Sequence, residues 1–240
     1  MRKIFNNNKF NYYGKKYLEW KNNTDCDISN RNNPYDEAGS QHNELVAEIE
    51  SMGTPGMSLD EVFRLVDQVA NEHYGKELIQ GFTSKEFATP IINFETEVEY
   101  QAYINNLKIS ENQKQDIFKL NEIMFSYDGK NLCEITETIK NFENELLTRY
   151  KPDEIENVLI SSSVGRYALA YWDNRMKEDS TSMQRRGFWK KFFTAVADAI
   201  GGAAGAVAGS ATVVGGIGGG VVGAIGASTG FAKVWDIFAE

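Results

Sequence analysis

Residues 199–232 read AIGGAAGAVAGSATVVGGIGGGVVGAIGASTGFA, a stretch of 34 residues that carries no charged side chain and contains twelve glycines. More than half of the 21 glycines in the chain lie in it. Glycine and alanine let two helix backbones approach closely, in a membrane or in an assembly of copies. The composition therefore predicts a pair of closely packed helices near this end of the chain.

The glycines are spaced so that they share helix faces. Positions four apart lie on one side of a helix, so each block of glycines forms a groove without side chains. We assign helix packing to Gly201, Gly205, Gly209, Gly215, Gly219, Gly223, Gly226 and Gly230. Residues 215–220 hold too much glycine to favour a continuous helix, so we expect the chain to turn there and fold back near residue 217.

Aromatic and cationic residues flank this stretch on both sides. If the chain folds back near residue 217, they gather at one end of the resulting hairpin, as in the interfacial belt of a membrane protein. The residues predicted to lie at a membrane interface are Arg185, Arg186, Trp189, Lys190, Lys191, Phe193, Trp235 and Phe238.

The stretch is nevertheless a weak membrane anchor by itself. Its five Val, three Ile and one Phe supply roughly −3 to −5 kcal/mol on the insertion scale. Twelve glycines in place of alanine cost on the order of 10 kcal/mol of helix propensity. Each arm of about 15 residues is also shorter than the roughly 20 that a single span needs. Membrane association, packing onto the rest of the protein and low-complexity disorder therefore stay open as alternatives.

The middle of the chain is helical by pattern. Ser58 and Glu61 have the spacing of a capping box before an apolar face, and Gly75 ends that helix. Ser110 and Gln113 repeat the start signal. The clearest amphipathic stripe comprises Leu132, Ile135, Ile139, Phe142 and Leu146. Another helix is expected after Pro152, roughly over residues 153–176. Residues 94–100 alternate like a strand, but helical spacing continues beyond them, so we expect a helix there too.

These patterns predict an all-α protein in four parts. The parts are an Asn-rich flexible arm over 1–40, a helical domain over 41–176, a hinge over 177–187 and a glycine-rich helical hairpin over 188–240. The first 35 residues contain nine Asn and no apolar period, which favours the arm. A strand-rich lead-in is the alternative for this segment.

Charge and cysteine content exclude several classes of protein. A formal net charge of −9 argues against nucleic-acid binding. Cys26 and Cys133 are too few for a disulfide framework and lack metal-site spacing. The first residues carry the cations of a signal peptide without its apolar segment. We expect no cofactor, no metal and no nucleic-acid partner. We also expect a cytoplasmic protein as synthesised, unless it associates with a membrane or is exported by a signal-independent route.

The sequence offers no catalytic signature. Gly218, Gly220 and Gly223 match the spacing of a dinucleotide-binding fingerprint, but the chain ends too soon after them for the second strand of that motif. His42 and His73 are the only histidines. We therefore predict that the protein is not an enzyme and that it has no catalytic residues.

Residues 33–46, which read NPYDEAGSQHNELV, resemble the opening of a group of uncharacterised bacterial proteins. That group has a Gly-x-x-His-Asn element, a helical middle with a helix like residues 158–172, and a Gly/Ala-rich tail. The resemblance makes His42 and Asn43 candidate functional residues. The alternative is that they cap a helix that begins with NELVAEIE. The tail is also similar to the glycine-zipper segments of small membrane-active bacteriocins.

Two functions follow as expectations. The first is a membrane-associating protein that engages a bilayer or assembles with copies of itself through its glycine-zipper hairpin, with bacteriocin-like antagonism as one version. The second is a soluble interaction or oligomerisation protein that uses the hairpin as a protein–protein interface, with an unknown protein partner.

Overall fold

The computed structural model describes residues 26–54, 57–75, 83–92, 97–178, 185–209 and 213–234, and every regular element among them is a helix. The prediction of an all-α fold is therefore confirmed. The elements are α2 (Glu37–Met52), α3 (Leu59–Tyr74), α4 (Ser84–Ile92), α5 (Glu97–Asn106), α6 (Glu111–Phe125), α7 (Leu132–Arg149), η1 (Pro152–Ile155), α8 (Glu156–Glu178), α9 (Arg185–Gly209) and α10 (Val213–Val234).

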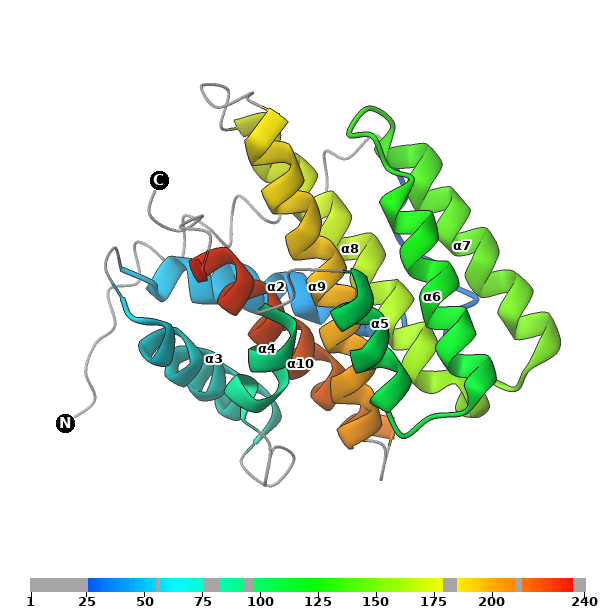
Figure 1. Cartoon of the computed structure of the whole chain (residues 1–240), viewed down its shortest axis with the longest axis horizontal. Helices are drawn as coiled ribbons and strands as arrows, with labels where there is room; N and C mark the ends of the chain where they lie inside the picture. Colours follow the sequence, from blue (N-terminus) through cyan, green and yellow to red (C-terminus); the bar gives the residue numbers. More distant parts are fainter. Residues whose placement is uncertain are drawn as a thin grey trace.

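The helices α9 and α10 lie in the middle of the molecule (Figure 1). Helix α8 runs beside α9, the group α2–α4 lies on one side of the pair, and α6 and α7 lie on the other (Figure 1). Helix α10 contacts α2, α3 and α4 as well as α9. One hydrophobic core contains side chains from α2 to α10. The uncharged end of the chain thus contributes to the centre of the fold.

The predicted helix starts and ends are present. The Ser58 hydroxyl accepts from the Glu61 backbone N–H at 3.3 Å, and the Glu61 carboxylate accepts from the Ser58 N–H at 2.7 Å. Ser110 and Gln113 form the same reciprocal pair at 3.2 and 2.8 Å. Gly75 ends α3 with φ of +80°, a conformation that glycine adopts at little cost. These local signals fixed the positions of α3 and α6.

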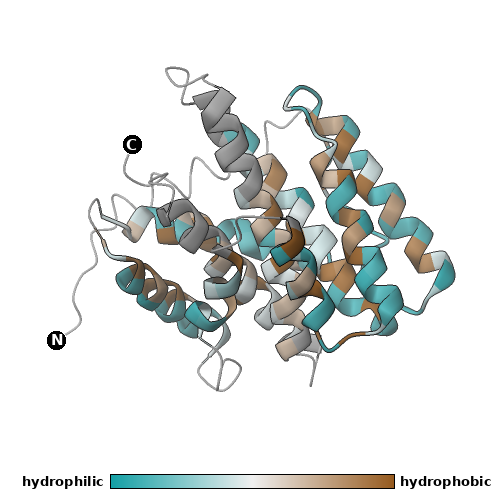
Figure 2. Cartoon of the chain, in the orientation of Figure 1, coloured by the Kyte–Doolittle hydropathy of each residue, from teal (hydrophilic) through white to brown (hydrophobic). Residues whose placement is uncertain are grey.

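The amphipathic stripe of α7 is also as predicted. Its five members are all buried, at 7% exposure or less. Figure 2 shows hydrophilic residues on the outward faces of α3, α6 and α7, whereas the described parts of α9 and α10 are pale to brown. Within the strand-like segment 94–100, the structure describes residues 97–100, which belong to α5 as expected. Burial of one apolar face of each helix therefore explains why the amphipathic segments α3, α6 and α7 are helical.

The prediction of a flexible arm over residues 1–40 is not confirmed. Residues 1–25 lie outside the described part of the chain, and residues 26–40 are packed against the body. Asn30 and Asn33 are only 5% and 3% exposed, and Asn33 Nδ2 donates to the Leu159 carbonyl oxygen at 3.0 Å. Helix α2 already begins at Glu37. Side-chain amides satisfied by the body explain why Asn-rich sequence is ordered here.

The predicted turn at residues 215–220 is wrong, because these residues belong to α10. Helix α9 ends at Gly209 and α10 begins at Val213. Close packing against α9 compensates for the low helix propensity of glycine, since tertiary context routinely overrides propensity. The capping alternative for Asn43 is also wrong, because α2 begins six residues earlier at Glu37.

The predicted boundaries of the last two parts differ from the helix ends. Helix α8 continues to Glu178 and α9 begins at Arg185, so the segment 177–187 includes residues of both helices. Residues 179–184 lie outside the described part of the chain. The division into a helical domain and a separate hairpin stays a prediction, and α9 and α10 share the hydrophobic core of α8.

Candidate functional site

Helices α9 and α10 meet through glycines. A Cβ atom added at Gly205 would overlap the carbonyl oxygen of Gly219, and one added at Gly219 would overlap the carbonyl oxygen of Gly205. Gly201 and Gly223 are related in the same way. Because residue 201 faces 223 and residue 205 faces 219, the helices run antiparallel with their backbones in contact. Any side chain at these four positions would force the helices apart.

The other predicted packing glycines have different surroundings. A Cβ at Gly219 would lie 3.2 Å from the Gly209 Cα, so Gly209 extends the same interface. Gly226 faces α4 instead, where an added Cβ would lie 2.9 Å from the Ser84 carbonyl oxygen. Gly215 and Gly230 lie within α10. The glycines of this pair thus serve contacts with the body as well as with each other.

Helix α9 packs on α8 through small residues and side-chain hydrogen bonds. An added Cβ at Gly202 would lie 3.6 Å from the Val164 Cβ, which is ordinary van der Waals contact. The Ser161 hydroxyl, which is fully buried, donates to the Ala199 carbonyl oxygen at 2.7 Å. Ala203 is also fully buried. The surface of contact between α8 and α9 is therefore made largely of small side chains.

One carboxylate lies against the start of α10. The Glu156 Oε1 atom occupies the place where a side chain at Gly216 would begin. This oxygen is buried and has no hydrogen-bond partner in the described structure. Burial, together with the charge of Asp153, raises the pKa of Glu156 above its usual value. Glycine at position 216 is what allows the carboxylate to approach the helix this closely.

His42 and Asn43 lie in the middle of α2 and belong to a buried polar cluster. Asn43 Nδ2 donates to the Tyr167 carbonyl oxygen at 2.8 Å, which turns Asn43 Oδ1 toward His42 Nδ1 at 3.0 Å. Nδ1 therefore carries a hydrogen and donates it. His42 Nε2 lies 3.2 Å from Asp198 Oδ1, without hydrogen-bond alignment.

Asp198 connects three helices in this cluster. Its second oxygen, Oδ2, accepts from Trp172 Nε1 at 3.1 Å, so the carboxylate of α9 is held by α8 and by α2. His42 and Asp198 are 0% exposed and Trp172 is 1% exposed. A cluster this deep offers no place for a substrate in the described state. Its evident role is to fix α9 to the body, and we call it the Asp198 anchor.

A second buried cluster centres on Arg166 of α8. Its guanidinium donates to both carboxylate oxygens of Glu143 at 3.0 and 3.1 Å, and it also pairs with Asp36. Burial opposes the charge of Arg166, but Glu143 and Asp36 outweigh it and raise the arginine pKa. Asn30 Nδ2 also donates to Glu143, at 2.6 Å. The cluster therefore holds the segment before α2 onto α7 and α8.

A disulfide ties the same segment to α7. Cys26 and Cys133 are bonded, with Cα atoms 5.1 Å apart, and they lie 107 positions apart in sequence. No pattern in the sequence predicted this pairing. Together with the Arg166 cluster, this bond explains why residues 26–36 pack against the helices of the body.

The predicted membrane-interface residues cannot be placed as a belt. Residues 185–193 are helical in α9, but their side chains lie outside the description, as do Trp235 and Phe238 altogether. The six affected side chains on α9 are Arg185, Arg186, Trp189, Lys190, Lys191 and Phe193. The interfacial role of this set stays a prediction.

Sequence reasoning missed the residues that hold the two buried clusters together. Arg166 is the only charged residue between positions 158 and 172, and Asp198 is the only one between 192 and 232. A lone charge in an uncharged helix is rarely buried without a partner. That isolation was the available signal, although it does not reveal which residue the partner is.

The chain shows no match to models of known protein families, to curated proteins or to solved structures. The resemblance based on residues 33–46 therefore stays a prediction. Among the residues that the structure describes, no group of His, Cys, Asp or Glu is arranged to hold a metal ion. Within the same residues, no helix combines the length and the apolarity needed to cross a bilayer.

Proposed function

We propose that this protein associates with membranes by releasing α9 and α10 as a glycine-zipper hairpin that the helical body holds in its centre. The observation that carries the proposal is the backbone contact between the two helices at Gly201, Gly205, Gly219 and Gly223. These contacts lie within the hairpin and do not depend on the body. A hairpin of this kind can leave its seat as one unit while keeping its tightest packing.

The chemistry of the hairpin fits a bilayer surface. Asp198 is the single charged residue among the described side chains of α9 and α10. Asp198 is therefore the charge among these described side chains that must be neutralised or exposed when the hairpin leaves. The remaining contacts with the body are made largely by alanine, glycine and valine. These residues can leave the apolar core of the body for the apolar part of a bilayer at low cost, because neither environment exposes them to water.

Length and apolarity together favour an interfacial position. With 22 residues, α10 extends roughly 33 Å, about the thickness of the hydrocarbon core. The hairpin arms are thus longer than the sequence predicts, but no described helix is apolar enough to span. We therefore propose that the hairpin lies at the surface of the bilayer and does not span it.

The disulfide supports action outside the cytoplasm. Disulfides such as Cys26–Cys133 form and persist in oxidising compartments. We propose that the protein reaches such a compartment before it engages a membrane. Antagonism of neighbouring cells, as with bacteriocins, is one form that such a function takes. No enzymatic step is part of the proposal.

A crosslink between body and hairpin tests the proposal. The Val164 Cβ and an ideal Cβ at Gly202 are 3.6 Å apart, within the range of about 3.5–4.5 Å that a disulfide requires. In flotation with anionic liposomes, the oxidised double variant Val164→Cys/Gly202→Cys should bind at least about tenfold less than its reduced form. The lock works because the hairpin cannot leave α8. Deleting the tail is a poorer test, since α9 supplies part of the core.

Wild-type protein with and without reductant is the matched control, because it carries the native disulfide but no lock. The single variants Val164→Cys and Gly202→Cys control for the substitutions themselves. Equal flotation of the oxidised lock and the wild type would contradict hairpin release. If wild-type protein ignored liposomes under every condition, the soluble interaction protein would become the better interpretation. The burial of α9 and α10 side chains in the hydrophobic core of the body is the observation that favours this second candidate.

A further inference from the structure

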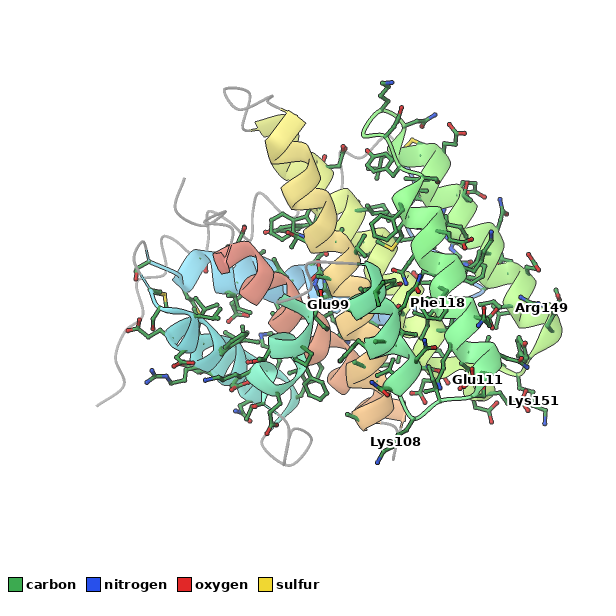
Figure 3. All side chains as sticks on the ribbon, viewed as in Figure 1. Glu99, Lys108, Glu111, Phe118, Arg149 and Lys151 are labelled. Atoms are coloured by element: carbon green, nitrogen blue, oxygen red, sulfur yellow. A yellow bond between two sulfur atoms is a disulfide. The ribbon has the colours of Figure 1, made fainter. Side chains whose placement is uncertain are left out.

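The Cys26–Cys133 disulfide lies at the surface of the protein. Cys133 is exposed and Cys26 is half-buried. Cys133 belongs to the first turn of α7, whereas Arg149 is the last residue of the same helix (Figure 3). Exchange of a disulfide requires a thiolate to reach one of its sulfur atoms, so exposed disulfides are the labile ones. The position of this bond therefore makes it accessible to thiols in solution.

The bond fixes one end of residues 27–32, which we call the strap. At its other end the strap continues into α2 through Asn33 and Tyr35, which are only 3% and 5% exposed. The strap contains turns but no helix, with Asn30 as its one buried residue and Ile28 as its one half-buried apolar residue. In Figure 1 it belongs to the dark-blue segment that passes behind α6 and α7. With so little buried apolar surface, the strap depends on polar contacts and on the disulfide for its position.

The polar contacts of the strap lead to the Arg166 cluster. The Arg166 guanidinium donates to the Ile28 carbonyl oxygen, and Asn30 Nδ2 donates to Glu143 Oε2 at 2.6 Å. Water can replace the strap in both contacts, because Arg166 and Glu143 remain paired with each other at 3.0 Å. Opening of the strap thus hydrates an ion pair and leaves neither charge alone, which avoids the main cost of disturbing a buried ion pair.

The disulfide keeps the strap close to these partners. Without it, the strap is attached at one end only, and the effective concentration of its polar groups at α7 and α8 falls. We propose that the Cys26–Cys133 bond is a redox switch, in which reduction by a small thiol such as glutathione detaches the strap and admits water to the Arg166 cluster. Reoxidation closes the strap again. This inference does not depend on membrane association.

The reduction takes two thiol–disulfide exchanges. A glutathione thiolate attacks the sulfur of Cys133, which forms a mixed disulfide and releases Cys26 as a thiolate. A second glutathione thiolate attacks the glutathione sulfur of the mixed disulfide, which releases Cys133 and forms glutathione disulfide. Two electrons thus pass from two glutathione molecules to the protein, and the two cysteines take up the two protons that the glutathione thiols gave up.

Amide hydrogen exchange in the full-length protein tests whether reduction opens the strap. The Asn30 N–H donates to Asp36 Oδ2 at 3.1 Å in the oxidised protein. After reduction with dithiothreitol, this amide should exchange at least about tenfold faster. The amide of Val66, in the middle of α3, is the internal control and should keep its rate. If both amides accelerated by the same factor, or if neither did, the bond would not control the strap and the proposal would be wrong.

The double variant Cys26→Ser/Cys133→Ser is the matched control, because it lacks the bond in every buffer. Its Asn30 amide should exchange at the rate of the reduced wild type and should not respond to dithiothreitol. A slow Asn30 amide in this variant would mean that the polar contacts hold the strap without the bond, which contradicts the proposal.

A redox equilibrium distinguishes a switch from a purely structural disulfide. Native wild-type protein is equilibrated with mixtures of glutathione and glutathione disulfide, and alkylation with iodoacetamide followed by mass spectrometry measures the reduced fraction. We expect this fraction to rise with the share of glutathione, and the exchange rate of the Asn30 amide to rise in parallel. Structural disulfides resist reduction by glutathione. Wild-type protein that stayed oxidised in excess glutathione would therefore overturn the proposal.

Discussion

The pairs α6–α7 and α9–α10 use opposite means to hold two helices together. Helices α6 and α7 present stripes of large apolar side chains, and both begin with side-chain caps at Ser110 and Asn131. Helices α9 and α10 present backbone, since glycines occupy the positions of contact. Packing in the first pair depends on the volume of its side chains, whereas packing in the second depends on the absence of side chains at the contact. The two pairs should therefore respond differently to the same type of substitution.

The two pairs also differ in whether local propensity or tertiary packing stabilises their helices. Each glycine in a helix costs about 1 kcal/mol relative to alanine, so α10 is poor in local propensity. Its described central residues are nevertheless almost wholly buried. Packing within the pair and against the body must therefore offset the propensity cost. For α7, the local pattern and the tertiary contacts favour the same outcome.

The largest effect is expected from adding one methyl group at the centre of the glycine interface. Gly205→Ala places a Cβ onto the Gly219 carbonyl oxygen, so we expect a loss of about 4 kcal/mol, above the usual range for overpacking. Gly202→Ala is the matched control, because its Cβ meets Val164 at 3.6 Å and alanine adds about 1 kcal/mol of helix propensity. Urea unfolding measures both. Similar stabilities for the two variants would contradict the backbone contact.

A smaller loss is expected from removing side-chain volume in the other pair. Ile139 of α7 is 0% exposed, so Ile139→Ala should destabilise the protein by about 3 kcal/mol and Ile139→Val by about 1 kcal/mol. The graded response is typical of a filled core. Urea unfolding again provides the measurement, with Thr138→Ala on the exposed face of the same helix as control. Equal losses for the two Ile139 variants would mean that volume does not determine this contact.

The smallest effect concerns the charge of the Glu156 carboxylate, which lies against the start of α10. Because the pKa of Glu156 is raised by burial and by Asp153, the folded state binds this proton more tightly than the unfolded state. Its contribution to stability is therefore gained as pH falls through the raised pKa and lost at neutral pH. Glu156→Gln should be more stable than wild type at pH 7, by less than about 1 kcal/mol.

Urea unfolding at several pH values checks this prediction. The gain from Glu156→Gln should shrink toward zero below about pH 4, where the unfolded carboxyl is protonated as well. Glu122→Gln, on the exposed face of α6, should show little gain at any pH. A gain that stayed constant down to acidic pH would mean that the charge of Glu156 is not its cause.

Sequence patterns predicted the outer helices well because their signals are short in range. Ser58 with Glu61 and Ser110 with Gln113 are three residues apart, and the stripe of α7 repeats every three or four residues. The same spacing rule predicted that glycines of this stretch share helix faces, and the role of the whole predicted set in helix packing stays a prediction. It failed at residues 215–220, where local propensity favoured a turn and packing against α9 produced a helix instead.

The candidate sites were predictable only in part. His42 and Asn43 attracted attention through a resemblance, yet their neighbour Asp198 lies 156 positions from His42 in the printed sequence. A small hollow lined by Gln113 of α6, Asn157 of α8 and Ala206 of α9 also joins segments that are far apart in sequence. No periodicity relates such distant positions, because their proximity depends on how every intervening helix packs.

By itself, the sequence determined the all-α class, the starts of α3 and α6 and the buried face of α7. These features depend on hydrogen bonds and side-chain spacing within a few residues. Only the tertiary structure decided that α9 and α10 lie at the centre of the fold, that Arg166 and Asp198 have buried partners, and that Cys26 joins Cys133. Those outcomes depend on burial shared among many helices, which no local stretch of sequence encodes.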